Sequence, residues 1–528
     1  MKQTLAGARW VALAVAALTA LGLALRLARY RQAVFGDELS TLYIVEGRSL
    51  AEMMDYVSGD AEISPPLYFI LAWLASKIGS APELVRLPSL VAGTISIPLT
   101  YLVGARAINR PAGLIAAGAM ALSPFMIFYS ADGRGYAVTI ALLLGSTLAM
   151  LAAVRSGSGR WWVAYGALSL LAMYTHYTAA FVLAAQLLWL LWAHPAARRP
   201  ALLANLGAGV LYLPWIAGLA ADVGSPTTDL LYSIQGEGLA VKLRSIGSWA
   251  IGYPYKTLSD FLGPVPALLA AAGFAAAATV GLLRHLRARA SGSPRPPPVS
   301  PGMALAVALA ASNIALALLF LLVTGNDLLS ARGLVTASAG LSLLAGAVLA
   351  SAGRLWGSAC TVLVAACLAF GAGQTLATEN RLPDFKSAAA RIEAEAGPGD
   401  VVVDLSLAAG ATPVPLTPLD AYLGQDRPEY RIGLPEGEPP FLPQTPVPDA
   451  ATLLRKAVRQ ARGGSLIVVA GDGSLARSGD EATAIVAGPG SEPVGLPPGS
   501  KVVAEERFPG LGPVDVITID VGRTAGAG

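Results

Sequence analysis

Apolar segments close to 20 residues long recur along the first 375 residues of this 528-residue chain. A helix of that length crosses the hydrocarbon core of a bilayer, which is about 30 Å thick. Charged residues make up 13% of the chain, about half of the share of ~25% that is usual in soluble domains. The sequence therefore predicts a polytopic α-helical membrane protein.

Eleven segments fit this description. They lie near 10–27, 84–104, 112–130, 137–154, 161–175, 178–193, 201–220, 262–283, 303–324, 333–352 and 356–373. Short cytoplasmic loops are enriched in Lys and Arg. With the N-terminus inside, the loops on that side are 106–110, 155–160, 194–199, 284–298 and 351–354, and they contain eleven arginines. The short loops on the other side contain only Arg134 and Arg332, which predicts an N-in, C-out topology.

Two segments leave alternatives open. Segment 66–80 is apolar but only about 15 residues long, so we expect an interfacial helix; as a full span it would reverse the topology. The first span resembles a signal peptide, because Lys2 and Arg9 precede its apolar run. No small-residue cleavage site follows that run, so we expect an uncleaved anchor. Arginines near its end (Arg26, Arg29 and Arg31) have the side-chain length to snorkel to the headgroups.

The chain changes character after residue 375, which divides it into a membrane module (1–375) and a soluble tail (380–528). The tail alternates expected helices with expected strands, which predicts an extracytoplasmic α/β domain. The expected helices are 385–397 and 449–461, and the expected strands are 401–405, 465–470, 501–508 and 514–521. The Pro- and Gly-rich stretch 407–448 is expected to be mostly loop.

Polar residues suited to chemistry gather in the loops of the predicted outer face. The first outer loop, 28–83, is expected to contain juxtamembrane helices and carries the adjacent carboxylates Asp37 and Glu38. Two neighbouring carboxylates are unusual in a chain so poor in charge. The other candidates in these loops are Pro66, Tyr68, Asp132, Arg134, Tyr136, His176 and Arg332.

Each candidate also has a structural explanation. Asp37 suits a helix N-cap, Asp132 and Arg134 could form an ordinary ion pair, and His176 could be a hydrogen-bonded turn residue. Arg332 is less easily explained this way, because a cation at an outer helix start opposes both the helix dipole and the charge rule. We therefore favour an anionic ligand for Arg332.

Taken together, these groups predict a site for a lipid phosphate. A carboxylate can act as a general base on a hydroxyl, and arginine binds phosphate through two parallel hydrogen bonds. The sequence contains three histidines, His176, His194 and His285, and the last two map to cytoplasmic loops. We therefore expect no metal site and no required cofactor, although the outer carboxylates could hold Mg²⁺ or Mn²⁺.

Several short motifs follow one another in an order that resembles a known family. They are FGDELSTLY (35–43), SPPLYFILAWL (64–74), VRLPSLVAGTISIPLTYLVGARAI (85–108), ALSPFMIFYSADGRGYA (121–137), THYTAAFVLAAQ (175–186) and SARGLVTASAGLSLLAG (330–346). The segment DFKSAAARIEAEAGPGDVVV (384–403) resembles the start of the soluble tail in that group. The chain resembles the C-type, polyprenyl-phosphate-dependent glycosyltransferases, specifically bacterial relatives of protein O-mannosyltransferases and aminoarabinose transferases.

The resemblance implies an enzyme of a bacterial cytoplasmic membrane. Such an enzyme transfers a sugar, with inversion, from a polyprenyl-phosphate donor to an extracytoplasmic lipid, glycan or protein acceptor. It implies Asp37 as the catalytic base, with Glu38 beside it. Asp132 and Arg134 would shape the donor and acceptor site, Tyr136 matches the family's tyrosine, and Arg332 would face the donor phosphate.

Three positions depart from the family pattern. Ser64 stands where a histidine usually precedes Pro-Pro, Asp132 replaces a glutamate, and Gly333 stands where a tyrosine commonly follows the late arginine. The departures leave the sugar and the acceptor open. Two other classes also stay open, a transporter or flippase of a lipid-linked sugar and a non-catalytic envelope scaffold. Nucleic acid is not an expected partner.

Overall fold

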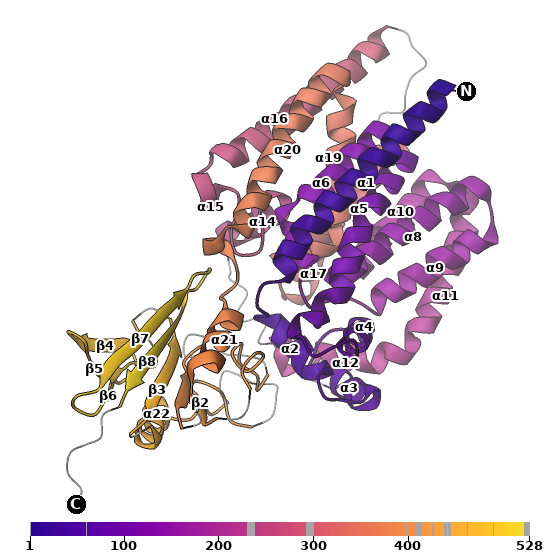
Figure 1. Ribbon diagram of the computed structural model, residues 1–528. Coiled ribbons are helices and arrows are strands. Elements are labelled where there is room, and N and C mark those ends of the chain that lie inside the picture. Colours follow the sequence, from indigo (N-terminus) through magenta and orange to yellow (C-terminus); the bar gives the residue numbers. More distant parts are fainter. Residues whose placement is uncertain are drawn as a thin grey trace, which may run out of the picture. The chain divides into compact units, whose positions relative to one another are not determined.

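The computed structural model describes residues 2–59, 61–229, 238–291, 300–397, 399–407, 414–424, 427–437, 441, 445–461, 463–471, 473–488 and 490–521. These residues form two compact units. The helical unit contains 1–30, 54–75 and 86–375, and the mixed unit contains 31–53, 76–85 and 376–528. Figure 1 labels the elements of both.

Among the residues that the structure describes, eight helical segments are long and apolar enough to cross a membrane. They are Ala8–Tyr30, Pro82–Ala107, Tyr136–Ser156, Pro195–Val223, Val265–Ala290, Pro301–Thr324, Ala331–Ser351 and Arg354–Leu376. Shorter apolar helices are α4 (Leu67–Ser76), α6 (Arg110–Leu122) and α10 (Ala179–Ala193). Each of the eleven predicted spans corresponds to helix in the structure, and helix α9 (Gly159–Met173) accounts for 161–175.

The described elements of this unit are α1 (Lys2–Tyr30), α5 (Leu87–Ala107), α7 (Pro124–Tyr129), α8 (Tyr136–Ser156), η2 (Pro195–Ala197), α11 (Arg198–Tyr212), η3 (Leu213–Trp215), α12 (Ile216–Val223), α14 (Leu239–Ile251), α15 (Ser259–Leu262), α16 (Val265–Ala290), α17 (Pro301–Thr324), α18 (Ala331–Leu334), η4 (Val335–Ala337), α19 (Ser338–Ser351) and α20 (Arg354–Leu376), together with α4, α6, α9 and α10. Helix α4 has 10 residues and is about 15 Å long. It is about half the length of a membrane span, and its interfacial placement stays a prediction.

Arg26 does not snorkel. It lies on α1, is 0% exposed, and donates to the carbonyl oxygens of Met120 (3.0 Å) and Ala121 (3.3 Å). These are among the last carbonyls of α6, which ends where Ser123 begins the short helix α7. Carbonyls at a helix end need outside donors, and a membrane interior has no water to supply them. Arg26 therefore stabilises the break between α6 and α7, immediately before the loop that carries Asp132.

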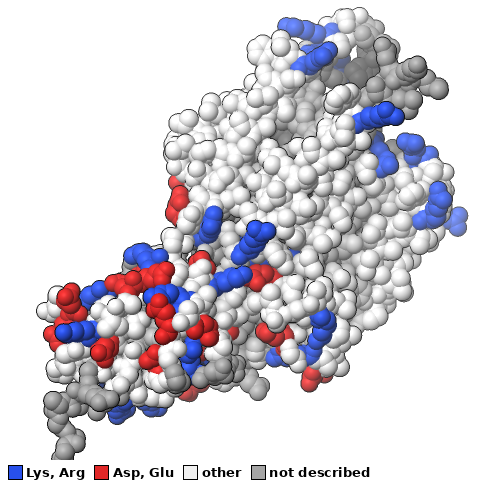
Figure 2. Space-filling view, viewed as in Figure 1, with Lys and Arg blue, Asp and Glu red and all other residues white. Residues whose placement is uncertain are grey.

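The arginine-rich turns and the candidate site residues occupy opposite ends of the helical unit. At one end Arg284 Nη1 donates to the Ala352 carbonyl (3.2 Å), and Trp189 Nε1 donates to the Pro301 carbonyl (2.8 Å). Helix α8 runs from Tyr136 to Ser156 and separates the two ends by roughly 30 Å. In Figure 2 blue side chains gather at one end of the helical unit, and an uncharged flank follows them. This arrangement matches the charge separation expected from the sequence.

An eight-stranded sheet forms the core of the mixed unit. Its order is β2-β1-β3-β8-β7-β5-β4, with β6 paired to β5. Strand β1 is parallel to both β2 and β3, and the other pairings are antiparallel. The strands are β1 (Val401–Asp404), β2 (Glu429–Arg431), β3 (Ser465–Ala470), β4 (Leu475–Ser478), β5 (Glu481–Ile485), β6 (Val494–Gly495), β7 (Lys501–Phe508) and β8 (Val514–Asp520).

Two helices cover the two faces of this sheet (Figure 1). Helix α21 (Phe385–Glu395) packs on Val402, Ile467 and Val469, whereas α22 (Ala450–Gln460) packs on Val401, Val403 and Val468. Neighbouring strand residues point to opposite faces, so the apolar runs of β1 and β3 serve both helices. The predicted α/β domain is present, with both helices and four strands near their expected positions. The prediction lacked β2, β4, β5 and β6.

The mixed unit also contains helix α2 (Asp37–Val45) and the short helix η5 (Thr378–Asn380). Helix α3 (Leu50–Val57) begins in this unit and ends in the helical unit. The short helix η1 (Pro82–Arg86) belongs to the mixed unit except for Arg86. The chain just before α2 is tied to the tail domain. Phe35 stacks on Phe385 of α21 with ring centroids 6.3 Å apart, and the Val34 N–H donates to the Tyr422 hydroxyl (2.8 Å). Glu83 joins this contact, because its carboxylate accepts from Tyr422 (3.2 Å) and from Lys386 (2.7 Å).

Candidate active site

Asp37 and Glu38 are the first two residues of α2, in the mixed unit. Gly36 occupies the N-cap position, so the capping explanation for Asp37 is wrong. Glu38 is 2% exposed and accepts from the Phe35 N–H (3.3 Å), which closes the turn in front of the helix. Asp37 is half-buried. The pair therefore divides into a fixed carboxylate, Glu38, and a more accessible one, Asp37.

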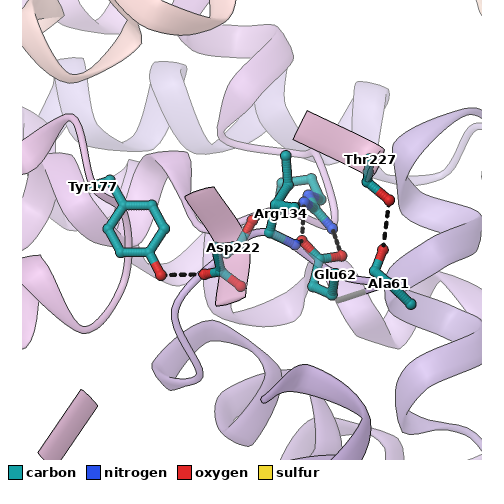
Figure 3. Close-up of polar contacts among 8 residues, drawn as sticks. Ala61, Glu62, Arg134, Tyr177, Asp222 and Thr227 are labelled. Carbon is teal, nitrogen blue, oxygen red and sulfur yellow. Dashed lines mark hydrogen bonds and ion pairs between the residues drawn. The ribbon is translucent and has the colours of Figure 1, made fainter. Parts of the chain in front are cut away.

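Arg134 and Glu62 form the strongest polar contact among the candidate residues of the helical unit. Arg134 Nη2 donates to Glu62 Oε1 (2.8 Å), and Nη1 donates to Glu62 Oε2 (3.0 Å). Arg134 Nη2 also donates to the Ser64 hydroxyl (3.0 Å). The two side chains are 13% and 5% exposed, so this is a nearly buried bidentate pair of the geometry that favours arginine over lysine. Figure 3 shows this pair edge to edge.

A narrow hollow opens beside this pair. It is lined by Ser64, Tyr68, Phe69, Arg134, Gly135, Tyr136, Thr175 and His176. It has room for about one water-sized group. Four of the predicted site residues, Tyr68, Arg134, Tyr136 and His176, therefore meet at one place. Among the residues that the structure describes, its lining includes no carboxylate, and its polar groups are a guanidinium, an imidazole and hydroxyls, all of which can donate hydrogen bonds.

The two loops that form the hollow lie very close together at Gly135. A Cβ atom on Gly135 would lie 3.0 Å from the Thr175 carbonyl oxygen and 3.4 Å from Tyr68 Cβ. A side chain here would need its neighbours to move by a few tenths of an ångström, so glycine is favoured at this close approach. Tyr68 extends from α4 below, and its hydroxyl pairs with Ser89 (3.0 Å) and reaches the Asp132 carbonyl (3.4 Å). The SADGRGY motif therefore contributes backbone contacts, at Gly135 and at the Asp132 carbonyl, as well as charged side chains.

His176 lies in the turn between α9 and α10 and is half-buried. Its ring packs against Tyr136, with ring centroids 5.1 Å apart. Burial, and secondarily the positive charge of Arg134, lowers the pKa of His176 to about 4. His176 is therefore neutral at physiological pH.

The remaining predicted residues surround this centre without all touching it. Pro66 is buried and begins α4, where its carbonyl accepts from Ile70 (3.0 Å). Arg332 lies in α18, whose N-cap Ser330 accepts from the Gly333 N–H (3.2 Å). Arg332 and Asp132 both lie within electrostatic reach of the Tyr129 hydroxyl, and Tyr129 contacts the Tyr136 ring (4.8 Å).

Gly333 explains one departure from the family pattern. A Cβ atom at this position would lie 2.1 Å from the Leu328 carbonyl oxygen, so no larger side chain fits without moving the turn. The chain at 328–333 is therefore folded tightly around Gly333, which fixes the backbone next to Arg332.

Sequence reasoning missed two carboxylates of this region, Glu62 and Asp222. Asp222, on α12, is 2% exposed and accepts from the Tyr177 hydroxyl through Oδ2, while Trp215 Nε1 donates to the same hydroxyl (2.9 Å). Thr227 reaches across to the Ala61 carbonyl (3.4 Å), and Figure 3 places these contacts around Arg134. Both carboxylates could have been noticed in the sequence because charged residues are rare in this chain. Glu62 lies two residues before the SPPLY motif, and Asp222 lies at the end of an apolar span.

Among the described residues, no group of three or more His, Cys, Asp or Glu side chains is arranged to hold a metal ion. The Mg²⁺ or Mn²⁺ that the outer carboxylates could hold therefore stays a prediction.

Residues 64–217 match a family model described as dolichyl-phosphate-mannose-protein mannosyltransferase. This segment contains every wall of the hollow, and it confirms the resemblance that the sequence motifs predict. A comparison with curated protein sequences gives no match.

One solved structure shares the fold along almost the whole chain. The structure of ArnT from Cupriavidus metallidurans in the apo state is 15% identical, covers 97% of this chain and 98% of its own, and gives a TM-score of 0.52. An oligosaccharyltransferase from Archaeoglobus fulgidus is 12% identical, covers 88% of this chain and 69% of its own, and gives a TM-score of 0.47. The ArnT match confirms a polytopic helical membrane protein with a C-terminal sheet domain. The family model and the fold together make the helical unit similar to the membrane domains of glycosyltransferases.

Proposed function

We propose that this protein transfers a sugar from a polyprenyl-phosphate donor to a hydroxyl group of an extracytoplasmic acceptor. The observation that carries the proposal is the donor-rich hollow at Arg134, inside the segment that matches the mannosyltransferase family. Preorganised donors of this kind stabilise negative charge that develops on an oxygen in the transition state. A departing lipid phosphate develops such charge.

The proposed reaction inverts the configuration of the sugar. Asp37 removes the proton from the acceptor hydroxyl, and that oxygen forms a bond to the anomeric carbon. The bond from the anomeric carbon to the phosphate oxygen breaks on the opposite face, and the polyprenyl phosphate leaves with the electron pair. A base of this kind contributes roughly 10²–10⁴-fold to a rate. Asp37 is proposed on the sequence resemblance, and its accessibility relative to the bonded Glu38 supports the choice.

The remaining assignments follow the same proposal. Arg332 contacts the donor phosphate, and Asp132, Arg134, Tyr136, His176, Pro66 and Tyr68 shape the donor and acceptor site. The site end of the helical unit faces the extracytoplasmic side of a bacterial cytoplasmic membrane, with an N-in, C-out topology. The arginine-rich turns at the opposite end support this orientation.

The test is turnover by the purified protein. It is incubated with a panel of polyprenyl-phosphate sugars and a mixture of extracytoplasmic lipid, glycan and peptide acceptors, and released polyprenyl phosphate is scored. We expect release from at least one donor and none with Asp37→Asn. Release without dependence on Asp37 would remove that residue as the base. If no donor is consumed but a labelled lipid-linked sugar crosses proteoliposome membranes, the protein is a transporter.

A further inference from the structure

The hydrogen bonds around His176 identify which ring nitrogen carries the proton. The backbone N–H of Thr178 donates to Nδ1 (3.2 Å), and the Thr178 hydroxyl lies 2.8 Å from the same nitrogen. A backbone N–H is always a donor, so Nδ1 is the acceptor. In the neutral ring the proton is then on Nε2.

A buried series of hydrogen bonds supports this tautomer. The Thr178 hydroxyl lies 3.1 Å from the Thr336 hydroxyl, and Asn313 Nδ2 donates to Thr336 Oγ1 (2.7 Å). Asn313 Nδ2 also donates to the Gly333 carbonyl, which fixes the orientation of the amide. Asn313 donates to Thr336 Oγ1, so the Thr336 proton is left for Thr178, where it faces the hydroxyl oxygen (3.1 Å) and the carbonyl oxygen (3.4 Å). The Thr178 hydroxyl then donates to Nδ1, which already accepts from the Thr178 N–H. Bonds aligned in one direction strengthen one another.

Asn313 is an unusual residue for its position. It lies in the middle of α17, a 24-residue apolar helix, and is 0% exposed. A polar side chain inside a membrane span is costly and is normally retained for a function. Here its amide joins the turn at Gly333, next to Arg332, to the turn that carries His176.

The Nε2–H of His176 has no hydrogen-bond partner among the described residues, while the ring itself lines the hollow with Arg134 and Tyr136. Four hydroxyl-bearing residues (Ser64, Tyr68, Tyr136 and Thr175) and the Arg134 guanidinium line this hollow with it. The arrangement suits an oxygen atom that accepts hydrogen bonds. It does not suit a cation, because no carboxylate lines the hollow.

We propose that His176 is a neutral hydrogen-bond donor, whose Nε2–H binds an oxygen of the substrate in this hollow, and that Thr178, Thr336 and Asn313 are positioning residues that fix its tautomer. The proposal deepens the transferase function given above and rests on it. The oxygen belongs either to the phosphate or to the sugar of the lipid-linked donor, and both are hydrogen-bond acceptors.

Two substitutions at His176 test the donor directly. His176→Gln places an amide N–H near the position of Nε2, whereas His176→Asn reaches only to the position of Nδ1. We expect transfer to fall about 100-fold in His176→Asn, as for removal of one preorganised donor, and to stay within about tenfold in His176→Gln. Equal activity of the two variants, at either a high or a low level, would overturn the proposal.

A spectroscopic readout tests the tautomer without turnover. The sequence contains three histidines, so ¹⁵N-histidine labelling of the full chain gives few signals, and His176→Gln assigns one of them. We expect an unprotonated Nδ1 and a protonated Nε2. Thr178→Val should shift the tautomer ratio, and Thr178→Ser should restore it. A protonated Nδ1 in the unmodified chain would overturn the assignment even if the protein proves to be a transferase.

Binding of polyprenyl phosphate alone identifies the oxygen. If His176→Asn weakens this binding about tenfold or more, Nε2–H contacts the phosphate. If binding is unchanged but the KM for the complete lipid-linked sugar rises, the contact is to the sugar. If neither changes and kcat is also unaffected, His176 does not bind the substrate. These binding measurements remain informative if no acceptor is found.

Discussion

Glu62 holds Arg134 through two parallel hydrogen bonds of 2.8 and 3.0 Å, at the edge of the hollow that the family-matched segment encloses. The pair is nearly buried, and removing one member of a buried ion pair leaves the other uncompensated. Glu62 is therefore the residue that fixes both the direction and the charge environment of Arg134.

Glu62→Gln should lower the thermal stability of the protein and lower transfer at least tenfold, because it removes the charge from the bidentate contact with Arg134. Breaking a buried pair typically costs about 3–5 kcal/mol. Asp260→Asn is the matched control, since it breaks the exposed pair of Asp260 with Arg244, and exposed pairs contribute about 0–1 kcal/mol. Equal effects of the two substitutions on melting temperature in detergent would contradict the buried-pair account.

Tyr177→Phe should destabilise the turn that carries His176. The tyrosine hydroxyl donates to Asp222 Oδ2, and Asp222 Oδ1 has no hydrogen-bond partner among the residues that the structure describes. Removing the only side-chain donor from a buried acceptor costs about 1–3 kcal/mol. Asp222→Asn removes the charge and keeps an acceptor, so it should be tolerated better than Tyr177→Phe at pH 8. Chemical denaturation that ranks the two variants in the opposite order would refute this explanation.

Tyr422→Phe and Phe385→Ala should reduce transfer without preventing membrane insertion. Both residues hold the segment just before Asp37, through the Val34 N–H and the Phe35 ring respectively. We expect a fall in kcat of about tenfold with little change in the KM for the donor, because the base is displaced while the donor site is unaffected. Lys456→Ala, on α22, serves as the control on the opposite face of the sheet. A rise in KM alone would show that the segment acts on donor binding instead.

Arg332→Ala should raise the apparent KM for the lipid-linked donor. Arg332 lies beside the tightly folded turn at Gly333, and the proposal places the donor phosphate there. A charge-assisted contact is worth about 1.5–3 kcal/mol, so we expect a rise of roughly 10- to 100-fold. Arg332→Lys should recover part of it. Steady-state kinetics with an unchanged KM would exclude a phosphate contact.

A buried carboxyl group makes the stability of the tail domain depend on pH. Burial, followed by the negative charge of Asp420, raises the pKa of Glu429 to about 7. Asp404 and Arg431 complete this cluster, and burial likewise raises the pKa of Asp404. A carboxyl group with a raised pKa in the folded state stabilises the fold below its unfolded pKa of about 4.3, and this contribution is lost as the pH rises through 7.

Glu429→Gln should therefore raise the melting temperature of the full chain at pH 8, and the gain should shrink towards pH 5. Glu436→Gln is the control, because Glu436 is exposed. Differential scanning fluorimetry at several pH values makes the comparison. A gain for Glu429→Gln that is constant from pH 5 to pH 8 would contradict the assignment.

The sequence predicts the helices well because a bilayer imposes a simple rule on them. Hydropathy alone gives the eight span-length apolar segments of the described residues and the shorter apolar helices α4, α6 and α10. Hydropathy could not predict the buried contacts of Arg26. The sequence shows only that this arginine lies near the end of a span, whereas its hydrogen bonds to the end of α6 depend on tertiary packing. Short strands such as β2 and β6 are missed because two or three residues carry no periodic pattern.

The candidate site, too, could be predicted from the sequence only in part. Motif order identifies Arg134, Tyr136 and His176, and these three residues meet in one hollow. Glu62, Asn313 and Asp222 lie far apart in the chain, and their roles come from pairings that no local pattern encodes. The short series from Asn313 to His176 needs two turns 158 residues apart to meet. Such contacts appear only once the chain is folded.

The most direct test of the central claim is release of polyprenyl phosphate from polyprenyl-phosphate sugars by the purified full-length protein, with Asp37→Asn measured beside it. The account predicts release from at least one donor, dependent on an acceptor hydroxyl and abolished by the substitution. Absence of release from every donor, by a protein that still binds polyprenyl phosphate, would contradict a transferase.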